Sequence, residues 1–568
     1  MGKKIAVLSN VNMNYMIRLL KKEHQVYEAE GYGNELGILM NGQSSYHAFA
    51  PEITFLLMDL MELLGHDLYS PELLGERAAE SGAAPDRQQA VEKGPASRLR
   101  EWFAQIDGCI RPGQIYYLSD AWLWGPETGA LPEVSLAQRL EGQWLEGLEW
   151  LEQRHENVRV FPYRRIIGSL GEENSFSLKT WYLGKILHTN LAQRRLAEEI
   201  GRLAELEQRT PKKVLLVDLD NTLWGGLAGE REHTPLELSE EHQGLAYKNA
   251  QRVLQLMERA GVVLGIVSKN NEEDAMAVIR EHPHMVLREQ DFAIRRINWQ
   301  PKHENIREIA HSLNLGLDSL VFWDDSPGER ALVQQMLPQV EVPPFPDSPV
   351  ELAPALAELY EKYFQKPRLT EEDRQKTRQY AENEQRNRLE EQTGDYDRFL
   401  RRLEIRAQVL DPGPHMERLV QLVNKTNQFN LTTLRYSLEE MQKTAADPAK
   451  KVYLYRVEDC FGDYGIVSAL IVSLAGGIPM VEEWVLSCRV MGKQVEDALL
   501  GHVEAELLRA GYTELRGRYV PTGKNRPVAE LYDRLGYREV SRGEGGEKEY
   551  SLCLKDAPSR AAHVAWPD

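Results

Sequence analysis

The chain is 568 residues long, with 42% apolar and 27% charged residues, which is typical of globular protein with about three to four domains. The formal net charge of −19, without basic runs or basic residues interleaved with aromatic ones, argues against a nucleic-acid partner. The four cysteines lack zinc-type spacing and no signal peptide or membrane-spanning run occurs, so we expect a cytoplasmic protein with reduced thiols and no membrane partner.

The first two hundred residues alternate between strand-like and helix-like patterns. Short apolar strands are expected at 4–8, 53–57, 114–118 and 159–162, each followed by helical patterning, which predicts an α/β domain over residues 1–209. Residues 77–100 are rich in alanine, glycine, proline and charge, which is typical of an exposed loop.

Ser9 follows the first predicted strand, and Asn10 and Asn12 come directly after it. This opening resembles the serine esterases of the SGNH type. The Asp-x-x-His motif that would activate the serine is missing, since His188 has Lys185 three residues before it. We therefore interpret this SGNH-like domain as a hydrolase fold used for binding.

A polar hinge at 208–213 leads into the stretch VLLVDLDNTLWGGLAG, residues 214–229. Its four apolar residues predict a buried parallel strand that runs into Asp218 and Asp220. Ligands bind at this edge of an open α/β sheet, and two acids there are costly to desolvate unless a cation or a proton neutralises them. The alternative is an ordinary Asp-x-Asp turn that caps the next helix.

Further polar residues follow two more apolar strands and precede one helix. They are Ser268 after residues 262–267, Lys302 ahead of a helical pattern, and Asp324 and Asp325 after residues 320–323. In this order the motifs resemble the haloacid dehalogenase superfamily of phosphatases, which implies a Rossmannoid domain over residues 210–365.

The resemblance implies a two-step phosphate hydrolysis. Asp218 would attack phosphorus and form an aspartyl-phosphate, and Asp220 would protonate the leaving oxygen and then activate water. Ser268, Lys302 and Thr222 would hold the phosphoryl oxygens.

The same resemblance implies a magnesium site. Mg²⁺, a hard cation that prefers oxygen ligands, would be held by Asp218, the backbone carbonyl of Asp220, and Asp324. Asp325 is either another ligand or an acid outside the ligand set, and the sequence leaves both possibilities open.

Two short intervals indicate that this phosphatase domain is capless. About thirty residues separate Ser268 from Lys302, and the stretch from Thr222 to Glu241 is also short, so neither has room for a folded cap. An open site suits a phosphate presented on a long arm or by another protein. A charged helix that begins at Thr370 is expected within a linker over residues 366–400.

The last domain, residues 401–557, is followed by a predicted tail over 558–568. A hairpin at 452–457 and 466–472, a strand at 481–487, a strand-to-helix turn and a helix from Asn525 to Gly536 are similar to the α+β fold of the GNAT acyltransferases. Their Arg-x-x-Gly-x-Gly loop holds pyrophosphate at a helix start. Only Arg489, Gly492 and Lys493 match that loop here.

Several longer motifs together resemble the FkbH family. They are DLDNTLWGG from Asp218, DDSPGER from Asp324, NKTNQFNLT from Asn424, DCFGDYGIV from Asp459 and SCRVMGKQVE from Ser487. The resemblance implies transfer of a phosphoglyceryl group from 1,3-bisphosphoglycerate to an acyl carrier protein thiol, with removal of the phosphate, for polyketide or related assembly. The alternatives are a phosphatase fused to an acetyl-CoA-dependent N-acetyltransferase, and a scaffold that binds carrier protein without chemistry.

Cys488 is the predicted carrier of the acyl group, because it follows a strand and is expected to begin a helix whose dipole lowers a thiol pKa. The alternative is a buried cysteine that acts as a small apolar residue. His415 and His502 are both possible bases. The acyl-transfer candidates beside Cys488 are Arg489, Gly492, Lys493, Asn424, Asn427 and Asp463.

Overall fold

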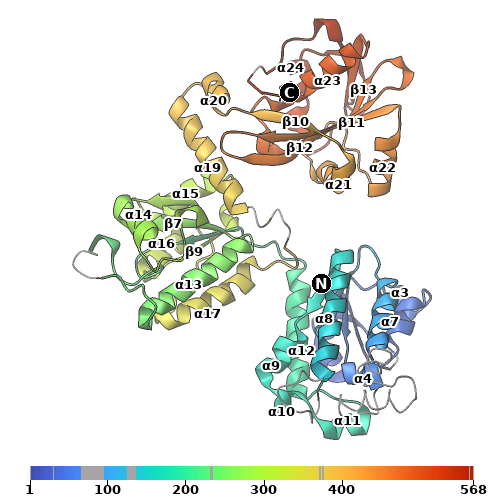
Figure 1. The fold of residues 1–568 in the computed structure, drawn as a ribbon, viewed down its shortest axis with the longest axis vertical. Coiled ribbons are helices and arrows are strands. Elements are labelled where there is room, and N and C mark those ends of the chain that lie inside the picture. The colour runs from blue at the N-terminus through green and yellow to red at the C-terminus, as the bar shows by residue number, and fades with distance from the viewer. Residues whose placement is uncertain are drawn as a thin grey trace. The chain divides into compact units, whose positions relative to one another are not determined.

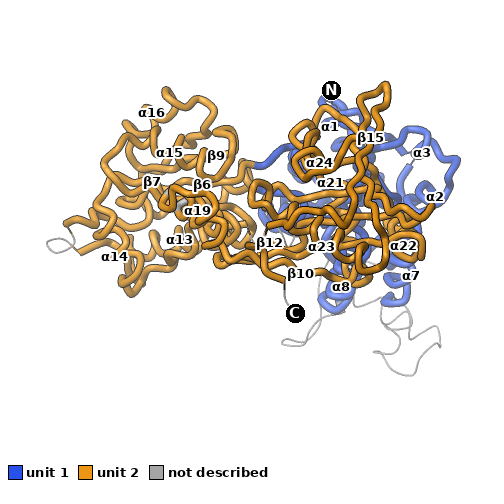
Figure 2. The backbone as a smooth tube through the Cα atoms, turned by 90° about the horizontal axis from the view of Figure 1, so that it is seen from above, with its two compact units in different colours: residues 1–211, 365–369 blue, residues 212–364, 370–568 orange. Residues whose placement is uncertain are grey.

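The computed structural model describes residues 2–29, 31–65, 95–124, 136–230, 235–369, 373, 376–561 and 563–566. The chain divides into two compact units, residues 1–211 with 365–369, and residues 212–364 with 370–568 (Figure 2). Within the described ranges, no helix combines the length and the apolar character needed to cross a membrane.

The first unit, which is coloured blue to teal in Figure 1, is built on a five-stranded parallel sheet with the order β2-β1-β3-β4-β5. Its strands are β1 Lys4–Ser9, β2 Gln25–Tyr27, β3 Ile53–Leu57, β4 Ile115–Ser119 and β5 Val158–Phe161. Its helices are α1 Asn14–Leu20, α2 Glu35–Met40, α3 Ser45–Phe49, α4 Leu60–Gly65, α7 Pro95–Asp107, α8 Leu136–Arg154, α9 Tyr163–Leu170, α10 Glu172–Ser175, α11 Leu178–Gly184 and α12 Asn190–Leu206.

Both faces of this sheet are covered by helices, which explains why its strands are short apolar runs. Alternate residues of β1 and β3 pack against α1 and α12 on one face and against α7 and α8 on the other. The predicted loop at 77–100 is wrong at its end, since α7 begins at Pro95. The apolar residues of α7 recur at helical spacing and are buried. Residues 77–94 lie outside the described ranges.

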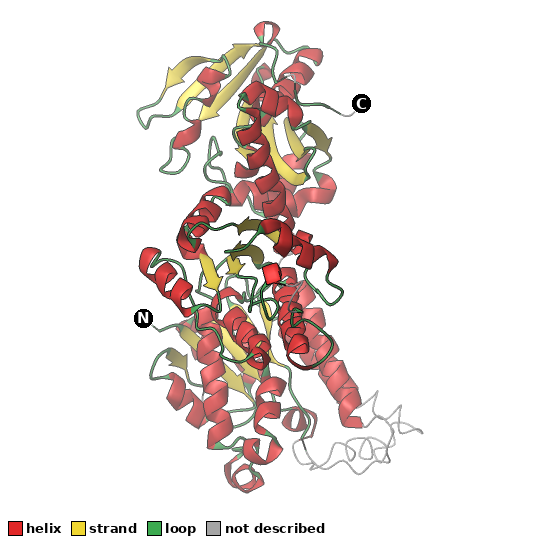
Figure 3. Ribbon diagram, turned by 90° about the vertical axis from the view of Figure 1, so that its left-hand side faces the viewer, coloured by secondary structure: helices red, strands yellow, loops and turns green. Residues whose placement is uncertain are grey.

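The second unit contains a four-stranded parallel sheet with the order β8-β7-β6-β9. Its strands are β6 Val214–Val217, β7 Val263–Ser268, β8 Phe292–Ile297 and β9 Leu320–Trp323. Helices α13 His242–Arg259, α14 Glu272–Glu281 and α17 Leu352–Leu359 pack on one face, and α15 Lys302–Ser312 and α16 Pro327–Met336 pack on the other. Figure 1 labels these helices, and Figure 3 draws helices in red and strands in yellow.

Strand β6 lies between β7 and β9, so all four of its residues are buried. Leu215 and Val217 face the α13 side, while Val214 and Leu216 face the α15 side. The residues that follow β6 therefore emerge at the centre of the carboxyl edge of the sheet, where ligand sites of open α/β folds lie.

A cap domain could be inserted only between Thr222 and Glu241 or between Ser268 and Lys302, and the described residues of these two intervals form small elements only. The first contains a 3-10 turn at Ala228–Glu230 and a bridge between Gly225 and Glu237, with 231–234 outside the description. The second is occupied by α14 and β8 of the core.

The charged helix α19 covers Lys376–Thr393 and is followed by α20 Tyr396–Arg402, while the predicted N-cap Thr370 lies outside the described residues. Glu384 of α19 pairs with Arg296 of β8 at 3.3 Å. Arg386 of the same helix donates two hydrogen bonds of 2.7 and 2.8 Å to Asp459, the residue that follows strand 450–458. The helix thus connects the parallel sheet with the remaining part of the same unit.

That remaining part is a seven-stranded sheet with the order β10-β11-β12-β13-β14-β16-β15, antiparallel except between β13 and β14. Its strands are β10 Arg406–Leu410, β11 Lys450–Glu458, β12 Asp463–Ser473, β13 Met480–Leu486, β14 Glu514–Tyr519, β15 Arg538–Arg542 and β16 Lys548–Cys553. Its α-helices are α21 Met416–Lys425, α22 Leu438–Ala446, α23 Val495–Arg509 and α24 Leu531–Arg534.

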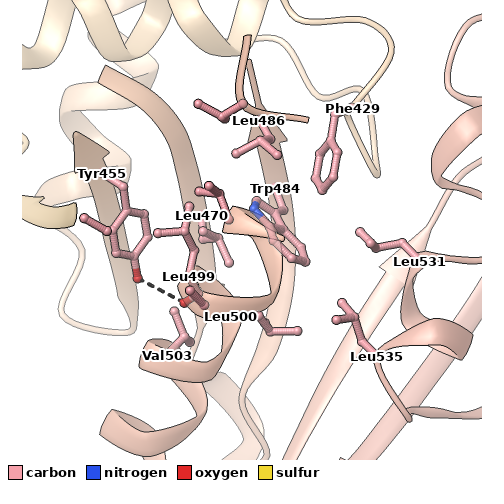
Figure 4. Close-up of a cluster of buried hydrophobic side chains, with 14 of the residues drawn as sticks. Phe429, Tyr455, Leu470, Trp484, Leu486, Leu499, Leu500, Val503, Leu531 and Leu535 are labelled. Atoms are coloured by element: carbon pink, nitrogen blue, oxygen red, sulfur yellow. Dashed lines mark hydrogen bonds between the residues drawn. The ribbon is translucent and has the colours of Figure 1, made fainter. Parts of the chain in front are cut away.

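Strands β13 and β14 pair only at Met480 and Val481, so the rest of β13 separates from β14. The segment Phe429–Leu431 fills this opening: the amide of Leu486 donates to Phe429 O at 3.1 Å, and the amide of Leu431 donates to Trp484 O at 3.2 Å. The rings of Phe429 and Trp484 lie 5.2 Å apart in a T-shaped contact (Figure 4). The motif that begins at Asn424 therefore contains, besides a polar loop, the segment Phe429–Leu431, which fills the gap between β13 and β14.

The continuous helix predicted from Asn525 to Gly536 is wrong. A 3-10 turn at Arg526–Val528 and the single turn α24 replace it, because the Asn525 side chain donates to the carbonyls of Asn430 and Val520 and holds the chain in a loop. The predicted tail contacts this sheet, since the amide of Ala407 donates to Ala565 O at 2.9 Å.

Candidate phosphatase and acyl-transfer sites

The carboxyl ends of β6, β7 and β9 bring the predicted phosphatase residues to one edge of the parallel sheet. Asp218 follows β6, Ser268 ends β7 and Asp324 follows β9, while Lys302 begins α15. Because β6 pairs directly with both β7 and β9, these side chains converge from neighbouring strands.

Lys302 is the cation at the centre of this cluster and is only 3% exposed. Its Nζ lies 2.5 Å from Asp324 Oδ2 and 3.0 Å from Asp218 Oδ1. Burial lowers the pKa of Lys302, but the negative charges of Asp218 and Asp324 outweigh burial and raise it overall. The ammonium group is therefore charged and fixed between two carboxylates.

The carboxylates exceed the positive charge available to neutralise them. Oxygens of the three carboxylates Asp218, Asp324 and Asp325 lie within 4.8 Å of one another. Two cations are nearby, the ammonium group of Lys302 and the guanidinium group of Arg330, which donates to the backbone oxygens of Asp324 and Asp325 at 2.7 Å. Desolvation, followed by repulsion from Asp218, raises the pKa of Asp324 to about 6, and desolvation raises that of Asp325. Asp218 Oδ1 is buried and makes no directed hydrogen bond, although it lies near Lys302 Nζ.

These observations fit a magnesium site. Three carboxylates with an excess of negative charge, no histidine or cysteine ligand among them, and one buried oxygen without a hydrogen bond match the oxygen ligands that Mg²⁺ prefers. Asp218, Asp324 and Asp325 could hold the ion, so the structure places Asp325 with the two acids predicted as ligands.

Asp220 is held by three donors rather than by the acidic cluster. Trp224 Nε1 and the amide of Ala228 donate to its Oδ1 at 2.9 and 3.0 Å, and Asn270 Nδ2 donates to its Oδ2 at 2.9 Å. Desolvation by burial and repulsion from Asp218 nevertheless raise its pKa. A fixed carboxyl with a raised pKa is suited to general acid chemistry.

Ser268 and Thr222 are buried at the same edge, and the Thr222 hydroxyl has no hydrogen-bond partner among the described residues. Asn221, between the acids and Thr222, has a left-handed φ of 54° that turns the chain sharply after the strand. Asn221 and Asp325 also line a cavity of about 320 Å³. A phosphate ester could approach the carboxylates through this space.

Cys488 lies at the end of β13 in the other sheet, and it is exposed. It begins a three-residue 3-10 turn, Cys488–Val490, whereas α23 begins only at Val495. Cys488 thus begins a helix as predicted, but this helix is a single 3-10 turn of three residues, which is too short to supply the dipole on which the prediction relied. Exposure of the thiol contradicts the alternative of a buried apolar cysteine.

A cavity of about 410 Å³ contains Cys488 in its wall. Residues of α21 and of the loop after it form one side, and the end of β13 and the 3-10 turn form the other. Two predicted candidates, Arg489 and Asn427, line this cavity, and two cations that sequence reasoning missed, Arg418 and Lys425, lie there as well. Their positions seven residues apart on one helix could have indicated a shared face.

The other acyl-transfer candidates lie elsewhere. Asn424 exchanges two hydrogen bonds with the backbone of Tyr436, and Asp463 pairs with Arg456 at 2.6 Å. Lys493 lies over the Tyr464 ring at 5.7 Å, and its Nζ donates to Arg489 O. These three side chains support the local fold and do not line the cavity that contains Cys488.

Gly492 lines a second cavity of about 600 Å³ at the start of α23. Three carboxylates, Glu496, Glu530 and Asp533, also line it, and Arg534 pairs with Glu496 at 2.9 Å. This helix start is therefore acidic, the opposite of what a pyrophosphate requires.

Neither proposed base lies in the wall of the cavity that contains Cys488. His502 is stacked against Trp566 with ring centroids 4.7 Å apart, and its Nδ1 lies 3.1 Å from the Tyr455 hydroxyl. His415 is the residue before α21 and lies in a 3-10 turn.

In the first unit, the Ser9 hydroxyl donates to Leu57 O at 2.7 Å. His188 is buried, its Nε2 lies 2.6 Å from the Tyr163 hydroxyl, and desolvation lowers its pKa to about 3. Among the described residues, no histidine forms a hydrogen bond with Ser9.

No protein-family model matches the chain, and no curated protein is significantly similar to it. Solved structures do resemble its parts. The N-terminal part of a Bacteroides fragilis protein, which contains a phosphatase domain and was crystallised with Mg, matches with 24% identity and a TM-score of 0.49, covering 65% of this chain and 95% of that one.

Two acetyltransferases of the GNAT fold resemble a smaller share of the chain. The ribosomal-protein-S18-alanine N-acetyltransferase from Escherichia coli matches with 12% identity and a TM-score of 0.21, covering 26% of this chain and 94% of that one. The Vibrio cholerae spermidine N-acetyltransferase in complex with CoA and spermine matches with 12% identity and a TM-score of 0.21, covering 27% of this chain and 96% of that one.

Proposed function

We propose that the protein transfers a phosphoglyceryl group from 1,3-bisphosphoglycerate to the thiol of an acyl carrier protein and then removes the phosphate, giving a glyceryl carrier for polyketide or related assembly. The observation that carries the proposal is the presence, in one chain, of a buried Asp218–Lys302–Asp324 centre and an exposed Cys488 in a cation-lined cavity. The motifs that resemble the FkbH family supply the identity of the acyl group.

In the phosphatase reaction, the Asp218 carboxylate attacks phosphorus, and the bond between phosphorus and the glyceryl oxygen breaks. Asp220, fixed by Trp224 and Asn270, donates its proton to the leaving oxygen and then takes a proton from the water that hydrolyses the aspartyl-phosphate. Lys302 holds Asp218 in place and offsets charge on the phosphoryl oxygens.

Asp218, Asp324 and Asp325 would hold Mg²⁺, which supplies positive charge for the developing negative charge of the phosphoryl oxygens. The raised pKa of Asp324 reflects crowding of acids that a divalent cation would relieve. Ser268 and Thr222 are buried at the same edge and are proposed as further contacts to phosphate.

In the acyl-transfer reaction, the sulfur of Cys488 attacks the acyl carbon of the mixed anhydride, and the carbon–oxygen bond to the leaving phosphate breaks. The thiol proton leaves with the phosphate or with solvent. The thiol of the carrier protein then attacks the thioester, which restores the Cys488 thiol at little cost in free energy, since one thioester replaces another.

The acidic cavity at the start of α23 supports a carrier-bound thiol over an acetyl-CoA substrate. Glu496 and Asp497 occupy the first turn of α23, and Glu530 and Asp533 lie nearby. The phosphates of CoA would meet like charge there, which costs binding free energy.

The first unit is proposed as an SGNH-like binding domain. The Ser9 hydroxyl is engaged with Leu57 O, and the buried His188 is paired with Tyr163, so neither is arranged as a nucleophile with its base.

Incubation of the protein with a phosphopantetheinylated carrier protein, 1,3-bisphosphoglycerate and Mg²⁺, followed by intact mass spectrometry, tests the proposal. A glyceryl-loaded carrier is the expected product. Acetylation of an amine from acetyl-CoA, with no loading, would favour a phosphatase fused to an N-acetyltransferase. Carrier binding without any covalent product would favour a scaffold.

A further inference from the structure

A cavity of about 320 Å³ lies beside the acidic centre of the parallel sheet. Asp325 belongs both to its wall and to the cluster of three carboxylates, so the cavity opens directly next to the proposed phosphatase centre. At ~30 Å³ per molecule it would hold about ten waters, which is more space than a phosphoryl group needs. A phosphate ester bound at the carboxylates therefore has room here for its organic part.

Much of the cavity wall comes from the proline-rich segment 343–352, PPFPDSPVEL. Its apolar surface is supplied by four residues of this segment, Phe345, Pro346, Pro349 and Leu352. The Phe345 ring packs against Trp323 with centroids 4.6 Å apart, and Trp323 is the residue before Asp324. Because proline fixes φ and Trp323 holds Phe345, this wall is ordered before a ligand binds, which lowers the entropy cost of binding.

Other parts of the wall come from the turn after β6 and from α13. The Asn221 side-chain oxygen accepts from the amide of Gly226 at 3.0 Å, which holds the turn in place. Tyr247 of α13 is 5% exposed and lines the cavity with a phenol that can donate a hydrogen bond. Two aromatic rings and a donor suit an organic group that combines apolar surface with a carbonyl oxygen, such as an amide or a thioester.

The charges in the wall disfavour a further carboxylate. Arg330 supplies one guanidinium group, which donates to Asp324 O and Asp325 O, both at 2.7 Å. Asp325 and Asp347 supply two carboxylates. Since carboxylates outnumber the cation among the described residues of the wall, an uncharged organic group is favoured over one that ends in a carboxylate.

We propose that this cavity binds the organic part of the phosphate ester, and that Phe345 and Tyr247 make the phosphatase centre selective for an extended, uncharged organic group over a short phosphorylated acid. The phosphoryl group lies at Asp218 and Lys302, and the organic group extends past Asp325 into the cavity. The assignment rests on the proposed phosphatase centre, and it is independent of acyl transfer at Cys488.

Three phosphate esters separate the contribution of the cavity from that of the phosphate chemistry. They are methyl phosphate, 3-phosphoglycerate and the N-butyl amide of 3-phosphoglycerate, which is uncharged beyond its phosphate and cannot acylate Cys488. Steady-state phosphate release by the full chain with Mg²⁺ gives kcat and KM for each. The amide should have a kcat/KM about tenfold or more above that of 3-phosphoglycerate.

Phe345→Ala should lower kcat/KM for the amide about tenfold, mainly through KM, because it removes apolar contact with the organic group. The loss should be smaller for methyl phosphate, whose organic part is too short to reach Phe345. Tyr247→Phe keeps the ring and removes the hydroxyl, and it should lower kcat/KM for the amide about threefold.

Trp299→Ala is the matched control for loss of an aromatic ring. Trp299 is 76% exposed, comes two residues after β8 at the same edge of the sheet, and lies outside the cavity. This variant should leave kcat/KM unchanged for all three esters. Thermal unfolding of each variant shows whether its fold is retained.

Equal kcat/KM for the amide and 3-phosphoglycerate, or a folded Phe345→Ala chain that keeps the preference, would overturn the assignment while leaving the phosphatase centre in place. Loss of the preference in Trp299→Ala would place the organic group on the β8 side and would also overturn it. No phosphate release from any of the three esters would contradict the phosphatase centre as well. A retained preference in a chain that loads no carrier protein would support the cavity assignment and contradict the proposed acyl transfer.

Discussion

Asp218→Asn removes the proposed nucleophile of the phosphatase centre while leaving a side chain of similar size beside Lys302. Phosphate release should fall about a thousandfold or more, because asparagine cannot form the covalent intermediate. The proposed transfer step uses Cys488 in another sheet, so a phosphoglyceryl carrier should accumulate, as measured by intact mass. Glu304→Gln, at an exposed position of α15, serves as the control and should behave like the wild type. Normal formation of glyceryl carrier by Asp218→Asn would contradict the role of Asp218.

Cys488→Ala should eliminate both a covalent adduct formed with 1,3-bisphosphoglycerate and the loading of carrier protein. The wild-type adduct should be released by hydroxylamine, which cleaves thioesters. Cys460→Ala and Cys553→Ala remove other exposed thiols of the same domain and should load normally. If Cys488→Ala loads carrier at the wild-type rate, the acyl group passes directly to the carrier and Cys488 has no covalent role.

Among individual residues, the order of motifs along the chain identified side chains that meet at one edge of the parallel sheet, but only two of the candidates proposed around Cys488, Asn427 and Arg489, line its cavity. Ser268 ends a short apolar strand, and Asp218 and Asp324 directly follow one, so the sequence pattern also places them at the same edge of the sheet. Lys493 is five residues from Cys488 but packs against Tyr464, whereas Arg418 is seventy residues away and lines the cavity. Proximity in an antiparallel sheet depends on pairing that sequence spacing does not reveal.

Among the elements, α19 contacts the β11–β12 hairpin through a buried ion pair between Arg386 and Asp459. The side chains of Arg386 and Asp459 are 4% and 0% exposed, and the Tyr464 hydroxyl also donates to Asp459 at 2.6 Å. Arg386→Met should lower the free energy of unfolding of this domain by about 3–5 kcal/mol, because it leaves a buried carboxylate without its cation. Denaturant unfolding followed by tryptophan fluorescence measures the loss.

The control for Arg386→Met is Lys443→Met, which breaks an exposed pair with Glu439 on α22. That pair contributes less than about 0.5 kcal/mol at a solvated surface. A loss below about 1 kcal/mol for Arg386→Met would mean that α19 is held to the hairpin chiefly by apolar contacts.

The elements that the sequence predicted well are those with strong periodicity and clear ends. Strand β3 coincides with its prediction, and β1, β4 and β5 are shifted by one residue or less at each end. Strands β8, β10 and β14 were not predicted, since charged or polar residues interrupt their apolar pattern. The predicted helix at 525–536 is interrupted because the buried Asn525 side chain donates a hydrogen bond to Asn430 O, in the segment that lies between β13 and β14. Asn430 is almost a hundred residues away in the sequence.

For the whole molecule, the two reactions should respond differently to removal of divalent metal. EDTA should stop phosphate release, since the charge excess of Asp218, Asp324 and Asp325 lies in the phosphatase centre. Acylation of Cys488 and transfer to the carrier should continue, because among the described residues no carboxylate lines the cavity around that thiol. The product should therefore change from glyceryl to phosphoglyceryl carrier, and excess Mg²⁺ should reverse the change.

Excess Ca²⁺ is the control for this metal prediction. Ca²⁺ should not restore phosphate release, because it has a larger radius and a looser coordination geometry than Mg²⁺. Full phosphatase activity in metal-free buffer would rule out the proposed role of the three carboxylates.

The first unit is discontinuous in sequence, and this affects how it is completed during synthesis. Arg202 donates to the Gln365 side chain at 2.6 Å, and Arg209 donates to Gln365 O at 3.1 Å, so the unit includes residues made after 212–364. At about 5–20 residues per second, a ribosome needs about 8 to 30 s to make those 153 intervening residues. During that time α12 has emerged without its last partner, and the four-stranded parallel sheet of the second unit can fold before the first unit is complete.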